Sequence, residues 1–289
     1  MEILVLGGTR FFGIHMVREL LRKGHQVTIA TRGRIIDEFG DSVKRIIVER
    51  TNPRSLLNAF KNKSYDVVCD NLAYCSNDVR YILDSVKCKR YIMVSSAAVY
   101  NKHFDTKETE FNPIATSLKW CSRGDFPYDE IKRQAECALF QNYSFQNAVA
   151  VRYPFVVGED DYTKRMYFYV EHIVKGIPMF VDNREKQLGF ICSDEAGKFL
   201  AYLTEQEFCG TINGSSYGTI SISEIDAYIE KKTGIKAIYT PDGDAAPYNG
   251  EDNYSINTET ARSIGFDFSV LNDWIYDLLD KYIKIANDI

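Results

Sequence analysis

The sequence, 289 residues long, lacks the features that mark membrane-spanning, secreted and metal-binding proteins. No run of about 18 apolar residues occurs, so no membrane-spanning helix is expected. The first eight residues lack a basic segment and a cleavage site, so no signal peptide is expected and the cytoplasm is the predicted location. None of the seven cysteines form a C-x-x-C pair, so neither a disulfide framework nor a metal site is expected.

An excess of basic residues is also missing. The chain has 35 Lys and Arg against 40 Asp and Glu, which gives a formal net charge of −5. We therefore expect neither nucleic acid nor an anionic membrane as a partner. Hydrophobic residues make up 45% and charged residues 26%, which is typical of a globular protein. A chain of this length forms one large domain or two closely joined domains, with room for a cleft that binds a small molecule.

Apolar strands and amphipathic helices alternate in the first half of the chain. Strands are expected at residues 2–6, 26–31, 45–48, 65–69, 91–94 and 148–152, and helices at 12–23, 76–86 and 128–141. This alternation indicates βαβ units and a parallel sheet. After about residue 155 it becomes irregular, with helices expected near 167–175, 193–204, 221–232 and 271–285. We predict an α/β fold, with a Rossmann-type doubly wound parallel sheet in residues 1–160 and a smaller C-terminal substrate-binding lobe in residues 161–289.

A glycine-containing loop joins the first strand to the first helix, and it runs from Gly7 to Gly13. In a Rossmann fold, the first glycine of such a loop permits a tight turn and the last lets the helix pack closely on the strand. The helix N-terminus then offers its amides to a pyrophosphate. The position between a strand and a helix supports this interpretation over a structural turn without a ligand. The predicted cofactor contacts in this loop are Gly7, Thr9, Arg10, Phe11, Phe12 and Gly13.

The end of the second strand bears on the choice between NAD and NADP. An acidic residue there would bind the ribose 2′-hydroxyl of NAD, but no acid occurs between Glu19 and Asp37. The strand ends instead in Thr31 and Arg32, and Arg34 follows. Guanidinium groups suit a 2′-phosphate, so NADP is favoured among the NAD(P) cofactors. The alternative is that Arg32 and Arg34 are solvated loop residues.

Three segments resemble the extended short-chain dehydrogenase/reductase family, also called NAD-dependent epimerases/dehydratases. They are the glycine loop, the Ser-rich strand end before Tyr100, and the Tyr-x-x-x-Lys motif from Tyr128 to Lys132. The resemblance covers nearly the whole chain, including Arg152–Gly158. Arg10 replaces the family's middle glycine, a departure shared by a subgroup that includes chloroplast stem-loop RNA-binding proteins.

The resemblance implies a catalytic triad of Ser96, Tyr128 and Lys132. It selects Ser96 over Ser95 because the family's serine lies four residues before the tyrosine at position 100. Residues four apart share a helix face, so Lys132 is expected beside Tyr128, where its ammonium would lower the tyrosine's pKa from about 10. Tyr128, Lys132, Tyr153 and Pro154 are further expected cofactor contacts. A second Tyr-x-x-x-Lys, from Tyr228 to Lys232, is interpreted as part of a surface helix.

Two departures bear on the substrate. The resemblance implies an Arg that binds a nucleotide-sugar diphosphate, where this chain has Leu188, and an Asn where it has Phe155. Lys164, Arg165 or Arg184 could replace the missing Arg.

The predicted function is an NAD(P)-dependent oxidoreductase, epimerase or dehydratase that acts on a hydroxyl or carbonyl of a sugar-like substrate, with nucleotide sugars as one class. The alternative is a Rossmann-fold protein without turnover, either an RNA-binding protein or an NADP sensor. A homodimer formed through the helices at 76–86 and 128–141 is also expected.

Overall fold

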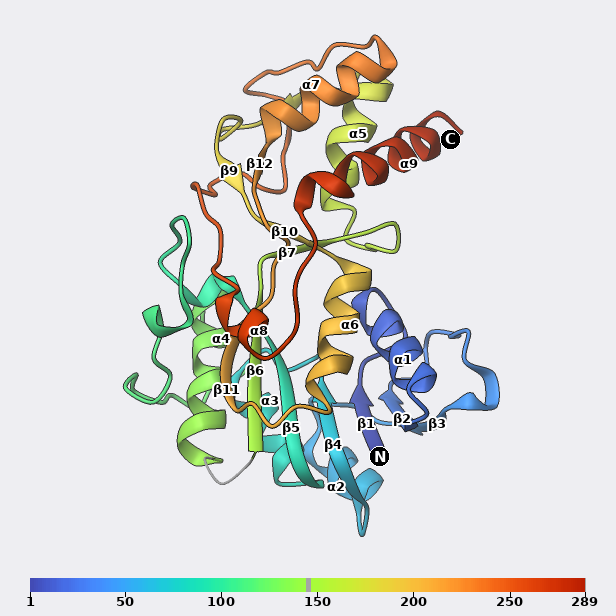
Figure 1. Cartoon of the computed structure of the whole chain (residues 1–289), viewed down its shortest axis with the longest axis vertical. Helices are drawn as coiled ribbons and strands as arrows, with labels where there is room; N and C mark the ends of the chain where they lie inside the picture. The colour runs from blue at the N-terminus through green and yellow to red at the C-terminus, as the bar shows by residue number, and fades with distance from the viewer. Residues whose placement is uncertain (144–146, 289) are drawn as a thin grey trace.

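The computed structural model describes residues 1–143 and 147–288 and contains a seven-stranded parallel sheet (Figure 1). The strand order is β11-β6-β5-β4-β1-β2-β3, with every neighbouring pair parallel. The strands are β1 (Glu2–Leu6), β2 (Gln26–Thr31), β3 (Lys44–Ile47), β4 (Ser64–Asp70), β5 (Lys87–Ser96), β6 (Asn147–Tyr153) and β11 (Gly210–Asn213). The chain order reverses between β1 and β4, which is the topological switch point where α/β proteins bind ligands.

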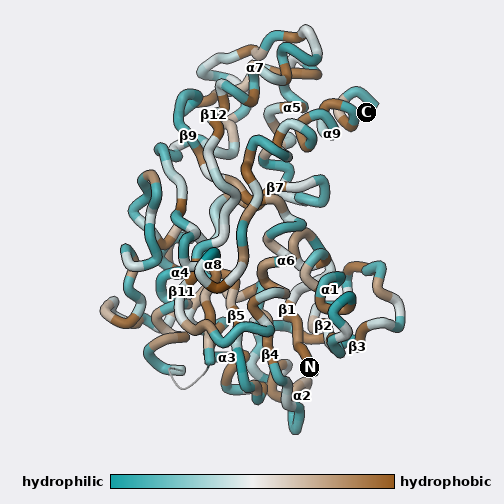
Figure 2. The backbone as a smooth tube through the Cα atoms, in the orientation of Figure 1, coloured by the Kyte–Doolittle hydropathy of each residue, from teal (hydrophilic) through white to brown (hydrophobic). Residues whose placement is uncertain are grey.

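Helices cover both faces of the sheet. The two layers are α1 (Phe12–Arg22), α6 (Ser193–Leu203) and α8 (Glu259–Ser263) on one face, and α2 (Pro53–Phe60), α3 (Ser76–Leu83) and α4 (Tyr128–Cys137) on the other. Because successive strand side chains point to opposite faces, Val5 packs with the first layer and Leu4 with the second. The strands at the centre of Figure 2 are mostly white to brown, and many of the peripheral loops are teal.

A smaller lobe lies beyond the carboxyl ends of the strands (Figure 1). Its elements are α5 (Arg165–Lys175), α7 (Ile222–Thr233) and α9 (Ile275–Asn287), with short strands β7 (Phe155–Val157), β8 (Met179–Phe180), β9 (Gln187–Leu188), β10 (Phe190–Cys192), β12 (Ile220–Ser221) and β13 (Asp244–Ala245). Ser221 and Glu224 form the capping box at the start of α7. Among the described residues, no helix has the length and apolar character needed to span a membrane.

The predicted fold class is confirmed, but the sheet extends beyond residue 160. Strand β11 pairs with β6 at the edge of the sheet, and α6 packs against α1. Both elements come from the region expected to form the second lobe. The division at residue 160 itself stays a prediction.

Candidate active site

Two adjoining cavities open at the carboxyl ends of the strands. The glycine-loop cavity, about 670 Å³, is lined by residues 6–13 together with residues that follow β2, β3 and β4. The Tyr128 cavity, about 510 Å³, is lined by residues 94–98, Tyr128, Lys132 and residues 153–156, with others from the small lobe. The residues that line both cavities are Phe11, Phe12, Asn71, Tyr74 and Tyr162. The two cavities therefore adjoin along these side chains.

The glycine loop has the backbone shape that a dinucleotide requires. Gly7 and Gly8 have φ values of +83° and +127°, which other residues rarely adopt. A Cβ at Gly13 would lie only 2.9 Å from the Cα of Gly8, so the loop and the start of α1 can approach this closely only with glycine there. The predicted contacts Thr9, Arg10 and the phenylalanines also line the cavity. The loop fits a bound pyrophosphate at the N-terminus of α1.

The charges in the glycine-loop cavity suit an anionic cofactor. Its lining contains five arginines, Arg10, Arg32, Arg34, Arg50 and Arg123, and one carboxylate, Glu49. Thr31 also lines it, and its hydroxyl accepts a hydrogen bond from the amide of Gly33 at 3.1 Å. Arg50 is 5% exposed, and its Nη1 has no hydrogen-bond partner among the described residues. A buried donor without a partner is costly, so a ligand acceptor in this cavity would satisfy it.

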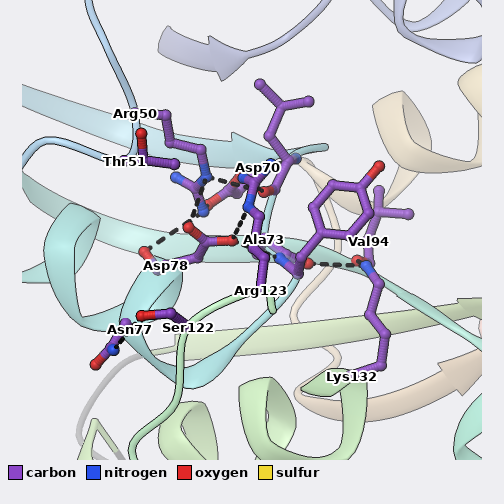
Figure 3. A network of polar contacts seen from close by, with 12 residues as sticks. Arg50, Thr51, Asp70, Ala73, Asn77, Asp78, Val94, Ser122, Arg123 and Lys132 are labelled. Atoms are coloured by element: carbon purple, nitrogen blue, oxygen red, sulfur yellow. Dashed lines mark hydrogen bonds and ion pairs between the residues drawn. The ribbon is translucent and has the colours of Figure 1, made fainter. Parts of the chain in front are cut away.

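Buried ion pairs hold the arginines at this end of the sheet (Figure 3). Arg50 forms an ion pair with Asp70 at the end of β4 and lies 3.8 Å from a carboxylate oxygen of Asp78. Arg123 Nε donates to the other carboxylate oxygen of Asp78 at 2.9 Å. The Asp78 carboxylate also accepts from the amide of Tyr74 at 2.9 Å. Asp78 therefore fixes the backbone at Tyr74, which lines both cavities.

Ser96 and Tyr128 lie together in the second cavity. The Ser96 hydroxyl accepts from the amide of Ala98 at 3.1 Å and forms a hydrogen bond with Tyr128. Tyr128 is 49% exposed, but burial of its hydroxyl end raises its pKa, and the bond with Ser96 acts in the opposite direction. Lys132 is not among the groups that lower this pKa, which are Ser96, Arg165 and Lys102, so the lowering expected from Lys132 stays a prediction.

Lys132 is buried beneath the cavity floor. Its Nζ donates to the carbonyl oxygens of Ala73 and Val94, at 2.8 and 3.0 Å (Figure 3). It lies 4.6 Å from the centre of the Tyr74 ring and 5.9 Å from that of Tyr128. Burial lowers its pKa to about 8, although the carboxylates of Asp70 and Asp78 act in the opposite direction. The i, i+4 spacing does place both side chains at one cavity, as predicted.

The two serines at the end of β5 have different partners. Ser95 is 3% exposed and donates to Glu136, which forms a fully buried ion pair with Arg152. Ser96 instead points its hydroxyl toward Tyr128. Ser95 is therefore engaged in the core, and Ser96 is the serine available at the cavity.

Tyr153, Pro154 and Phe155 line the same cavity. The Tyr153 hydroxyl donates to the carbonyl of Ala196 at 2.8 Å, and its ring centre lies 6.2 Å from that of Phe12. Tyr153 is 2% exposed, so it forms a wall that links the glycine loop to α6.

Of the three cations that could replace the missing Arg, Arg165 alone lines the cavity. Lys164 lies over the ring of Tyr167, and Arg184 over the ring of Tyr239. Leu188 is fully buried and brings no charge to the site. The second Tyr-x-x-x-Lys motif lies on α7, where the side chains of Tyr228 and Lys232 both bind Asp280, outside both cavities.

The sequence analysis missed several lining residues in the loops that follow strands. They are Glu49 and Arg50 after β3, Asn71 and Tyr74 after β4, and Lys102 after β5. Parallel strands end at one edge of the sheet, so position alone was a usable signal. Arg123 and Tyr162 lie in loops, and no local pattern marks them.

Comparisons with known proteins agree with this geometry. The model of the NAD dependent epimerase/dehydratase family matches residues 3–206. The chloroplast stem-loop binding protein of 41 kDa b of Arabidopsis thaliana is 25% identical over 238 residues, covering 75% of this chain and 60% of that protein. The chain thus spans less than two thirds of that relative's length.

Solved structures share the fold over the full length. A UDP-glucose 4-epimerase from Thermotoga maritima, solved with UDP-glucose, has a TM-score of 0.75 at 17% identity, covering 100% of this chain and 99% of that one. A UDP-glucuronic acid 4-epimerase from Bacillus cereus, solved with UDP-glucuronic acid and NAD, has a TM-score of 0.74 at 17% identity and the same coverage. The family model covers most of the chain, and the motifs that it shares line the two cavities. The chain therefore belongs to the NAD-dependent epimerase/dehydratase family, as its motifs predicted.

Proposed function

We propose that this protein is an NAD(P)-dependent enzyme that oxidises or reduces a hydroxyl or carbonyl group of a sugar-like substrate, with nucleotide sugars as the first class to test. The observation that carries the proposal is that the two cavities adjoin and share five lining residues. Ser96, Tyr128 and Lys132 surround one, and the glycine loop forms the other. The solved relatives that bind UDP-glucose and UDP-glucuronic acid support the substrate class.

The glycine loop and the arginines would hold the cofactor phosphates, and Tyr153 and Pro154 would border its nicotinamide. When bound, the nicotinamide takes up or returns the hydride. Tyr128 has a raised pKa and is protonated near neutral pH, so its hydroxyl can donate a proton to a carbonyl oxygen. Ser96, which already shares a hydrogen bond with Tyr128, would bind the same oxygen.

Oxidation of a hydroxyl requires Tyr128 to accept a proton instead. The ammonium of Lys132 is near enough to favour the phenolate when substrate and cofactor displace water from the cavity. In these roles Tyr128 is the general acid and base, whereas Ser96 and Lys132 orient its hydroxyl and adjust its pKa.

NADP is the proposed preference within the NAD(P) class. Arg10, Arg32 and Arg34 line the cavity at the end of β2, where a carboxylate would otherwise bind a ribose hydroxyl.

A second candidate function is suggested by the Arabidopsis relative, whose name states that it binds a stem-loop. The net charge of −5 argues against RNA binding, since nucleic-acid affinity depends on a basic surface.

One experiment separates the two functions. Purified protein is titrated with NAD and NADP, then with UDP-glucose and UDP-glucuronic acid, and in parallel with a stem-loop RNA. We expect cofactor binding, followed by a change in nicotinamide absorbance when the sugar is added. RNA binding without any such change would overturn the proposal.

A further inference from the structure

Three residues of α4 lie on one face of the helix and contact the end of β5. Tyr128, Lys132 and Glu136 are spaced four residues apart, so they form a stripe along about two turns. The stripe binds three consecutive residues of β5: the carbonyl oxygen of Val94 accepts from Lys132, the hydroxyl of Ser95 donates to Glu136, and the hydroxyl of Ser96 bonds with Tyr128. Tyr128 therefore lies at one end of the stripe and Glu136 at the other.

Glu136 is held on its other side by Arg152 of β6. Both side chains are fully buried, and the guanidinium donates to the two carboxylate oxygens, from Nε at 3.0 Å and from Nη2 at 2.5 Å. The remaining N–H groups of Arg152 donate to the hydroxyl of Tyr100 and to the carbonyl oxygens of Glu108 and Phe111. All five donors of the guanidinium are thus used, so the position of the Glu136 carboxylate is fixed.

The buried pair fixes a geometry more than it adds stability. Taking two charges out of water costs free energy that offsets most of their mutual attraction, so such a pair adds little net stability. The geometry that it fixes reaches the cavity through Ser95, which is 3% exposed and precedes Ser96 in β5. A shift of the Glu136 carboxylate would therefore move the strand end that carries the Ser96 hydroxyl.

Tyr128 depends on the later turns of its helix for its position. It is the first residue of α4, and the preceding Pro127 provides no side-chain cap. The amides of a first turn have no partners within the helix, so contacts of the following turns position this end. The bond between Ser96 and Tyr128 therefore depends on how α4 packs against β5.

We propose that Glu136 and Ser95 are positioning residues: the Glu136 carboxylate, fixed by Arg152, holds the end of β5 against α4 so that Ser96 and Tyr128 bind the same substrate oxygen. The catalytic roles of Ser96 and Tyr128 rest on the proposed function. Glu136 lies outside both cavities, so it acts through Ser95 and not on the substrate itself.

The first test asks whether Ser95 acts through Ser96. Single-turnover absorbance of the nicotinamide is measured for Ser95→Ala, Ser96→Ala and the double variant, with NADP bound and UDP-glucose or UDP-glucuronic acid in excess. We expect Ser95→Ala to slow the hydride step by about 10-fold with cofactor affinity retained, as the loss of one hydrogen bond does. In the Ser96→Ala protein, Ser95→Ala should add no loss, because residues that act through one contact are not additive.

Ser193→Ala is the matched control for Ser95→Ala. The Ser193 hydroxyl also donates to a carboxylate, that of Asp160 at 2.6 Å, and the residue is 2% exposed. Both residues lie outside the two cavities, so the hydride step should not change in this variant.

The second test does not require turnover. Burial lowers the pKa of Lys132 to about 8, and the charged groups that also act on it are Asp70, Asp78, Glu136 and Arg123. The Glu136 carboxylate raises this pKa, so Glu136→Gln should lower the Lys132 midpoint in an NMR titration of labelled lysines. Loosened packing would instead raise the midpoint toward 10.5. Asp226→Asn, which alters a carboxylate of α7 that is 1% exposed, should leave it unchanged.

Three results would overturn the proposal. These are additive losses in Ser95→Ala and Ser96→Ala, an equal loss in Ser193→Ala, or a Lys132 midpoint that stays or rises in Glu136→Gln. If Glu136→Gln does not fold, the cycle with Ser95→Ala decides, because that variant leaves the ion pair in place. Absence of turnover in the unsubstituted protein would refute the proposed function, and a lowered midpoint would still sustain the position of Glu136.

Discussion

The ammonium of Lys132 lies 4.6 Å from the centre of the Tyr74 ring, and this ring lines both cavities. The guanidinium of Arg123 lies 4.5 Å from the same ring centre. Tyr74 therefore contacts both a cation of the glycine-loop cavity and the lysine of the proposed triad.

The charge state of Lys132 can be measured directly. Burial lowers its pKa from the ordinary 10.5 to about 8, so the folded chain holds this proton less tightly than the unfolded chain. The destabilising contribution of Lys132 is thus full below pH 8 and disappears as the pH rises from 8 toward 10.5. A carbon NMR titration of labelled lysines should show one midpoint near 8, absent in Lys132→Gln.

Lys232 provides the internal control for that titration. It has the same spacing from a tyrosine, but its ion pair with Asp280 raises its pKa to about 12. A midpoint for Lys132 at or above 10 would contradict the burial described here.

Arg32→Ala should weaken NADP binding by about 10- to 100-fold, since it removes a charge-assisted contact with a 2′-phosphate. NAD affinity should remain nearly unchanged. Arg54→Ala, which removes an exposed arginine of α2 outside the cavity, is the control. Equal affinities for the two cofactors in the unsubstituted protein would refute the preference for NADP.

Asp78→Ala should lower the free energy of unfolding by about 1–3 kcal/mol, because it removes the buried carboxylate that accepts from Arg123 and from the amide of Tyr74, whereas Arg50 keeps its ion pair with Asp70. Asp129→Ala removes a half-exposed partner of Arg133 on α4 and should cost less than about 1 kcal/mol. Urea unfolding monitored by circular dichroism gives both values. Similar losses in the two variants would mean that the network around Asp78 adds little stability.

The homodimer through α3 and α4 stays a prediction. The segment that precedes α4 already contacts both helices, since Ser76 donates to the carbonyl of Lys119 and Gln134 donates to that of Ser117. A dimer would therefore include this segment, where Trp120 is 40% exposed. One chain has a mass of 33.1 kDa, and light scattering at micromolar concentration should give twice that mass. A mass of one chain would show that the prediction is wrong.

The sequence predicted the strands and helices well because local sequence patterns encode most of them. Leu4 and Val5 lie in an apolar run, and Ser221 and Glu224 form a capping box that is visible in the sequence. The edge strand β11 was missed because it has only four residues and because more than 50 residues separate it from its partner β6. Propensity does not encode such a partner.

The sequence predicted the site residues that belong to a motif. It did not predict the contacts and pKa values that depend on burial. The spacing of Tyr128 and Lys132 placed both at one cavity, but it gave no indication that Lys132 binds two carbonyls. The lowered pKa of Lys132 depends on its burial, and Arg50 is paired with carboxylates 20 and 28 residues away. These are tertiary contacts that no local pattern records.

The central claim is that Tyr128 transfers the proton while hydride moves between the cofactor and the substrate. Single-turnover absorbance of the nicotinamide, with cofactor bound and substrate in excess, measures that step. Tyr128→Phe should slow it by about 10²- to 10⁴-fold with cofactor affinity retained, and Tyr228→Phe should leave it unchanged. An unchanged rate in Tyr128→Phe, or a loss in Tyr228→Phe alone, would contradict the account.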